Sequence, residues 1–139
     1  MAYLIGALLA LAVGGTGTAV GLDRDRAFYP TIMMVIAAYY VLFGVMGGST
    51  HALVIEAAVG MLFLAAALVG FKYSLWLVVV ALASHGILDL FHGRLIANPG
   101  VPVWWPAFCS AYDVVAAGYL ALLQTTRLSK ERARVNTDP

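Results

Sequence analysis

Residues 73–92 read Y-S-L-W-L-V-V-V-A-L-A-S-H-G-I-L-D-L-F-H, an apolar stretch long enough to cross a bilayer as one helix. Its final third carries three titratable residues, His85, Asp89 and His92, at spacings i, i+4 and i+7. At about 100° per residue these positions fall within an arc of about 60°, so the three side chains are predicted to leave one helical face. Two imidazoles and a carboxylate are costly inside a membrane span, and their convergence indicates a function.

The composition of the whole chain predicts an integral membrane protein. Of its 139 residues, 63% are hydrophobic and 11% are charged, against a usual charged share of about 25%. A formal net charge of +1 argues against a nucleic-acid partner. The single cysteine, Cys109, excludes an intrachain disulfide and a thiolate cluster, and we interpret it as a small packing residue.

Five apolar stretches approach the ~20 residues that a membrane-spanning helix needs. We therefore predict an all-α, five-helix transmembrane bundle with spans at about residues 2–22, 28–47, 51–71, 73–92 and 106–124, followed by a polar cytoplasmic tail at residues 127–139. The first stretch has no basic segment before it, which indicates a retained span and not a cleaved secretory signal.

Basic residues set the expected orientation. Arg94 is the one basic residue on the side of the N-terminus, whereas seven fall on the side of the C-terminus: Arg24, Arg26, Lys72, Arg127, Lys130, Arg132 and Arg134. The positive-inside rule then places the N-terminus outside and the C-terminus in the cytoplasm.

This topology brings the ionisable residues of three spans to one depth. Measured from the outer ends of their helices at 1.5 Å per residue, Asp89 lies about 5 Å deep, Glu56 about 7 Å, and His85 and Asp113 about 10 Å. Unpaired charges there cost several kcal/mol in total, on the order of 2.5–3.5 kcal/mol each at the centre of a span. A bound cation would offset that cost, whereas without one the carboxyl groups would be driven toward their neutral forms.

We therefore favour a divalent metal site in the outer half of the bilayer. Nitrogen and oxygen ligands suit zinc, iron or manganese, and the predicted ligands are His85, Asp89, His92, Asp113 and His51. Glu56 is predicted to act as the general base. Arg94 is a candidate for binding an anionic headgroup at the mouth of the site, although it also fits a side chain that snorkels to the interface.

Two further patterns concern packing. Gly17 and Gly21, and likewise Gly44 and Gly48, are spaced by four residues, as in small-residue contacts between membrane helices. These faces would permit a homo-oligomer, with membrane lipids as the other expected partner. The pair Tyr39-Tyr40 is interpreted as ordinary lipid-facing or core-facing residues.

The stretch S-H-G-I-L-D (residues 84–89), followed by G-V-P-V-W-W-P (residues 100–106), resembles the small bacterial inner-membrane proteins known as membrane-bound metal-dependent hydrolases. In that family an S-H-x-x-L-D helix precedes a glycine and a short apolar W-P segment, and Thr50-His51 loosely matches an earlier T-H-S element. The resemblance implies an inner-membrane location, and it implies that His85 and Asp89, with His51, are metal ligands.

The sequence thus favours a metal-dependent hydrolase in which a bound ion activates water against a lipid or amphiphile. Several alternatives stay open. One is a small carrier or channel for protons or cations, and another is a haem protein ligated by His51 and His85. The third is a non-catalytic structural subunit, in which the polar cluster only fixes helix packing.

Overall fold

The computed structural model describes residues 1–135, except for the side chains of residues 130–132, 134 and 135. Its five helices are α1 (Ala2–Val20), α2 (Phe28–Met46), α3 (Thr50–Lys72), α4 (Leu75–Leu95) and α5 (Trp105–Val135), and no strand occurs in residues 1–135. All five are long and apolar enough to cross a membrane. The prediction of an all-helical chain with five membrane-length apolar helices is confirmed.

Local chemistry explains where the helices begin and end. The side chain of Ser49 caps α3 by accepting a hydrogen bond from the backbone N–H of Ala52 (3.2 Å). Pro30 lies in the first turn of α2, where a missing N–H does no harm. Helix α1 ends at Gly21, whose φ of 82° is favourable only for glycine.

Helix α5 is longer than the predicted fifth span. Its apolar part ends near Ser129, but the helix continues to Val135, because the Arg, Lys, Glu and Ala residues of this segment favour helix. Part of the predicted tail is therefore helical. Residues 136–139, and the side chains of Lys130, Arg132 and Arg134, lie outside the described part of the structure.

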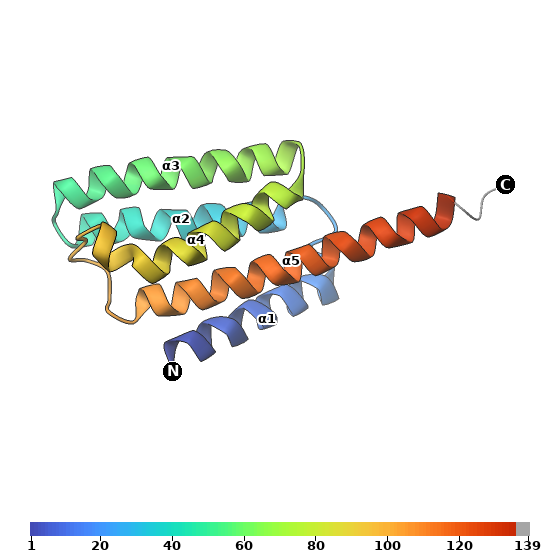
Figure 1. Ribbon diagram of the computed structural model, residues 1–139, viewed down its shortest axis with the longest axis horizontal. Coiled ribbons are helices and arrows are strands. Elements are labelled where there is room, and N and C mark those ends of the chain that lie inside the picture. Colours follow the sequence, from blue (N-terminus) through green and yellow to red (C-terminus); the bar gives the residue numbers. More distant parts are fainter. Residues whose placement is uncertain (136–139) are drawn as a thin grey trace.

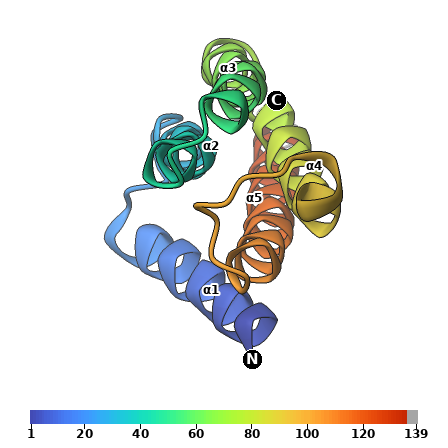
Figure 2. The ribbon, with the colours of Figure 1, turned by 90° about the vertical axis from the view of Figure 1, so that its left-hand side faces the viewer.

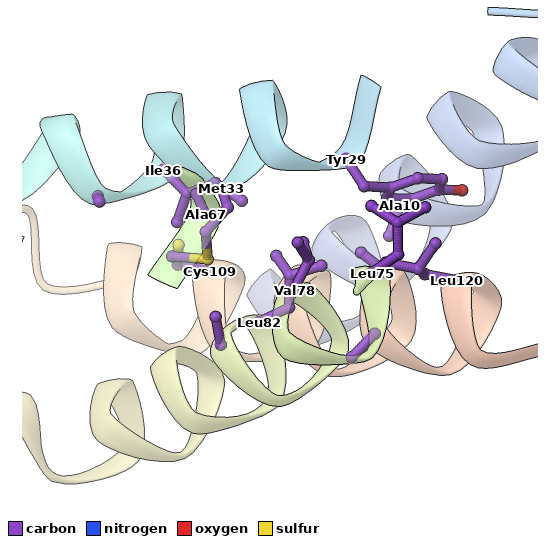
Figure 3. Packing of buried hydrophobic residues seen from close by; sticks show 14 residues of the cluster. Ala10, Tyr29, Met33, Ile36, Ala67, Leu75, Val78, Leu82, Cys109 and Leu120 are labelled. Atoms are coloured by element: carbon purple, nitrogen blue, oxygen red, sulfur yellow. The ribbon is translucent and has the colours of Figure 1, made fainter. Parts of the chain in front are cut away.

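The helices pack as two layers, one of α2 and α3 and the other of α1, α5 and α4, which contact each other mainly between α3 and α4. Helices α4 and α1 both lie along α5, α2 lies along α3, and α3 also contacts α4 (Figure 1). The apolar core between them includes Met33, Val78, Leu82 and Leu120, all essentially fully buried (Figure 3). At Gly44 a Cβ would lie 2.9 Å from Cα of Leu53, so this glycine allows the close approach of α2 and α3.

The outer faces of the bundle are apolar. Large side chains such as Leu62 (71% exposed) and Leu122 (63% exposed) project from it, as expected of helices surrounded by lipid. Gly17 and Gly44 are instead buried within the chain, against Phe28 and Leu53. A homo-oligomer through the glycine faces remains a prediction.

The loop of residues 96–104 closes one end of the bundle. Seen end-on, it crosses from α4 over to α2 before it returns to α5 (Figure 2). Asn98 holds this loop against α2 and α3, because its Nδ2 donates hydrogen bonds to the backbone O of Tyr40 (3.2 Å) and to Oε1 of Glu56 (3.0 Å). This end also holds the polar residues of the candidate site.

Candidate metal centre

Four buried side chains from α4 and α5 form a compact group: His85, Asp89, Cys109 and Asp113. Each offers one ligand atom, and these atoms lie within 4.8 Å of one another. None of the four residues is more than 2% exposed. We call this set the four-residue group.

Hydrogen bonds hold the group together. The imidazole Nδ1 of His85 lies 2.7 Å from Oδ2 of Asp113, at hydrogen-bond distance, and 3.6 Å from Oδ2 of Asp89. The thiol of Cys109 donates to the same Oδ2 of Asp113 at 3.7 Å. His85 therefore lies between two carboxylates that come from different helices.

The close approach of α4 and α5 depends on the residue after His85. A Cβ at Gly86 would lie 3.0 Å from the backbone O of Ser110 and 3.1 Å from Cβ of Asp113. A larger residue would push the helices apart and separate His85 from Asp113. The close packing of α4 against α5 thus explains why glycine occupies position 86 in the motif S-H-G-I-L-D.

Two carboxylate oxygens of the group accept no hydrogen bond from the described residues. Oδ2 of Asp89 and Oδ1 of Asp113 are buried, and neither accepts a hydrogen bond from any residue that the structure describes. Buried polar atoms are rarely left in this state, and such cases call for an explanation. One imidazole, one thiol and two carboxylates are a donor set that suits Zn²⁺ or Fe²⁺, so the residues present fit a divalent transition metal.

Tyr40 of α2 supports the group from a third helix. Its hydroxyl donates to Oδ1 of Asp89 at 2.7 Å, and its ring is stacked on that of His92, with 4.2 Å between centroids. From the sequence alone, Tyr40 is interpreted as an ordinary lipid-facing or core-facing residue. A usable signal was present, because a tyrosine in the middle of an apolar span needs a hydrogen-bond partner for its hydroxyl.

A second polar pair lies beside the four-residue group. Nε2 of His92 is 2.7 Å from Oε1 of Glu56, which also accepts the bond from Asn98. Both members of the pair are buried, at 3% and 2% exposure. Glu56 and Asp113, from α3 and α5, thus each contact a different histidine of α4.

A small cavity connects the two sets of residues. It has a volume of about 10 Å³ and is lined in part by Tyr40, Glu56, His85 and His92, which is room for about one water molecule. His92 and Asn98 also line a wider pocket of about 710 Å³ beneath the loop of residues 96–104. His92 is the lining residue that the small cavity and this pocket share.

Two predicted site residues lie apart from these contacts. His51 is exposed in the first turn of α3, and Arg94 is exposed in the last turn of α4. The structure brings neither into the four-residue group. Cys109, which we interpreted as a packing residue, is one of its members.

The buried charges do not balance. Three carboxyl groups (Glu56, Asp89 and Asp113) face two histidines, and no lysine or arginine is among the buried residues of the described chain. With the acids ionised, the cluster keeps a net negative charge even if both histidines are protonated. A bound cation would remove that excess.

Compared with models of known families, with curated proteins and with solved structures, the chain matches none of them. The site must therefore be interpreted from its own geometry.

Proposed function

We propose that this chain is a multi-pass membrane protein that holds a divalent metal ion at His85, Asp89, Cys109 and Asp113 and uses it to hydrolyse a lipid or another amphiphile. One observation carries the proposal: four potential ligands are buried with their ligand atoms within 4.8 Å of one another, and two of their carboxylate oxygens accept no hydrogen bond from the described residues. Zinc is the first candidate and iron or manganese the next. When bound, such an ion supplies Lewis-acid activation of water and of a carbonyl or phosphoryl oxygen.

The surrounding residues have separable roles in this proposal. Tyr40 orients Asp89 through its hydroxyl, as outer-shell partners orient metal ligands. Glu56 lines the small cavity and accepts hydrogen bonds from His92 and Asn98, so it is placed to take a proton from a water molecule there. His92 stands between Glu56 and the open pocket and can pass that proton toward solvent.

We propose the cell inner membrane as the location, with the N-terminus outside and the C-terminus cytoplasmic. Two observations support this orientation. Arg24, Arg26 and Lys72 lie in or beside the connections at one end of the bundle, and Arg94 lies near the other (Figure 1), as the positive-inside rule requires. Arg94 would then be exposed at the outer interface, where it can contact an anionic headgroup.

A proton or cation carrier is the main alternative, and the packing argues against it. Between the polar cluster and the opposite end of the bundle, the described core is formed largely by apolar side chains such as Val78, Leu75 and Leu120 (Figure 3). A carrier needs polar or charged groups along the route of the ion.

Metal analysis of the purified protein tests the proposal. We expect about one zinc or iron per wild-type chain and little in His85→Ala and Asp89→Ala, because each loses a ligand. Asp23→Asn is the matched control, since it changes a buried acid at the opposite end, and it should keep the metal. Negligible metal in the wild type would contradict the proposal.

A paired activity assay separates hydrolysis from transport. The metal-loaded protein in liposomes should release product from a bilayer lipid, and Glu56→Gln should abolish release while it retains the metal. Ion or proton flux that Asp89→Asn abolishes, without lipid turnover, would favour the carrier instead.

A further inference from the structure

An apolar groove on the side of the bundle reaches the candidate metal centre. It lies between α1, α2 and α5, has a volume of about 320 Å³, and includes no charged residue in its lining. This volume is at the lower end of the range for small-molecule sites. The groove shares no lining residue with the pocket beneath the loop of residues 96–104.

Cys109 joins the groove to the centre. It is a lining residue of the groove and a member of the four-residue group, and it is 2% exposed. In Figure 3 it lies beside Met33 and Ile36 of α2, and Ile36 also lines the groove. A molecule in the groove would therefore lie against Cys109, one of the four residues proposed to hold the metal.

The groove is elongated along the helices. On α2 its wall extends from Thr31 to Tyr39, which is about 12 Å at 1.5 Å per residue. On α5 it extends from Trp105 to Tyr112, about 10 Å on the same rise. Because these helices are proposed to cross the bilayer, the groove is parallel to the acyl chains of the surrounding lipids.

The geometry points to a binding site for one acyl chain of a bilayer lipid in the groove between α1, α2 and α5, with the polar linkage of that lipid beside Cys109. This inference rests on the proposed function and names its substrate class: a lipid with a hydrolysable linkage next to a hydrocarbon chain. The occupant is hydrocarbon because the lining is apolar and because a groove on the side of a spanning helix bundle opens to acyl chains. A water-soluble substrate would instead enter through the pocket next to His92.

Photo-labelling tests the inference. The probe is a phosphatidylglycerol with a diazirine on one acyl chain, mixed at trace level into phosphatidylethanolamine–phosphatidylglycerol vesicles that contain the wild-type protein. We expect adducts concentrated on groove peptides around Val35 and Cys109, and few on the exposed α4 face around Val80. Adducts spread evenly over the exposed faces of the bundle would overturn the inference.

Two variants and a matched control sharpen the test. Val35→Trp on α2 and Val13→Phe on α1 fill the groove from opposite walls. Each should lower groove labelling about tenfold, a change equivalent to about 1.4 kcal/mol. Val80→Trp, at a similarly exposed position outside the groove lining (59% against 50% for Val35), should leave labelling unchanged. Equal labelling in all three variants would contradict the site.

Metal content, measured on the same samples, keeps the two proposals apart. The groove variants leave the four-residue group intact and should retain the metal. If the wild type lacks metal but is labelled in the groove, the proposed hydrolase is wrong and the acyl-chain site is supported. If the wild type holds metal but is labelled evenly over its exposed faces, only the acyl-chain site is wrong.

Discussion

The two ends of the bundle bury acidic groups in different ways. At the end where α1 meets α2, Asp23 is 5% exposed and has partners: Thr18 Oγ1 donates to its Oδ2 at 2.7 Å, and Arg127 lies 3.8 Å from its Oδ1. At the other end three buried acids share two histidines, and two carboxylate oxygens accept no hydrogen bond from the described residues. Asp23 thus has a hydroxyl donor and a guanidinium nearby, whereas the second arrangement is the one for which we propose a bound metal ion.

We interpret this difference as one between a structural contact and the proposed metal site. Arg127 further fixes the first end, because its guanidinium donates to the backbone O of Asp23 at 2.6 Å. The four-residue group has no such cation among the described side chains. Buried negative charge without a matching cation lowers stability, and the metal ion proposed for this site would offset that cost.

The largest expected effect is that of His85→Ala. The substitution leaves Asp113 and Asp89 without their shared imidazole, and removing one partner of a buried pair costs about 3–5 kcal/mol. The control is His51→Ala, which removes an exposed histidine and should change the free energy of unfolding by less than about 0.5 kcal/mol. Unfolding measured in detergent micelles checks both, and similar losses for the two variants would contradict the assigned roles.

A smaller effect is expected from adding metal. Zinc at 100 times its dissociation constant should stabilise the wild type by about 2.7 kcal/mol, and a chelator should reverse the gain. Asp89→Asn should lose this gain, whereas Asp23→Asn should keep it. A gain of equal size in Asp89→Asn would show that zinc binds elsewhere.

At the opposite end of the bundle, the stability lost on substituting Asp23 should be the same with and without zinc. Asp23→Ala removes the acceptor of the Thr18 hydroxyl, and we expect a loss of about 2 kcal/mol, as for a hydrogen bond to a charged group. The Arg127 contact adds little, because that side chain is 41% exposed. Thermal unfolding with and without zinc should give the same loss, and a loss that depended on zinc would remove the distinction between the ends.

The smallest expected effect comes from Tyr40→Phe. The ring remains to stack on His92, but Asp89 loses its hydroxyl donor, so zinc affinity should fall about tenfold. Tyr39→Phe changes the neighbouring, partly exposed tyrosine and is the matched control. Competition with a chelator of known affinity measures both, and equal affinities in the two variants would exclude an orienting role for Tyr40.

The sequence predicts much of this architecture, because hydropathy alone identifies the five apolar segments that form helices of membrane-spanning length. Spacing within one helix also predicts that His85, Asp89 and His92 share a face. The sequence does not predict how neighbouring helices are rotated about their own axes. That rotation depends on close contacts between helices, such as the contact of Gly86 with Ser110. For that reason the pairing of Glu56 with His92 and of Asp113 with His85, and the place of Cys109 in the group, emerged only from the structure.

X-ray absorption at the zinc edge of the zinc-loaded protein tests the central claim most directly. We predict one sulfur scatterer at about 2.3 Å together with nitrogen and oxygen scatterers at about 2.0–2.2 Å. Cys109→Ser should remove the sulfur and leave the lighter shell. A zinc spectrum without sulfur in the wild type, unchanged by Cys109→Ser, would contradict a metal centre at His85, Asp89, Cys109 and Asp113.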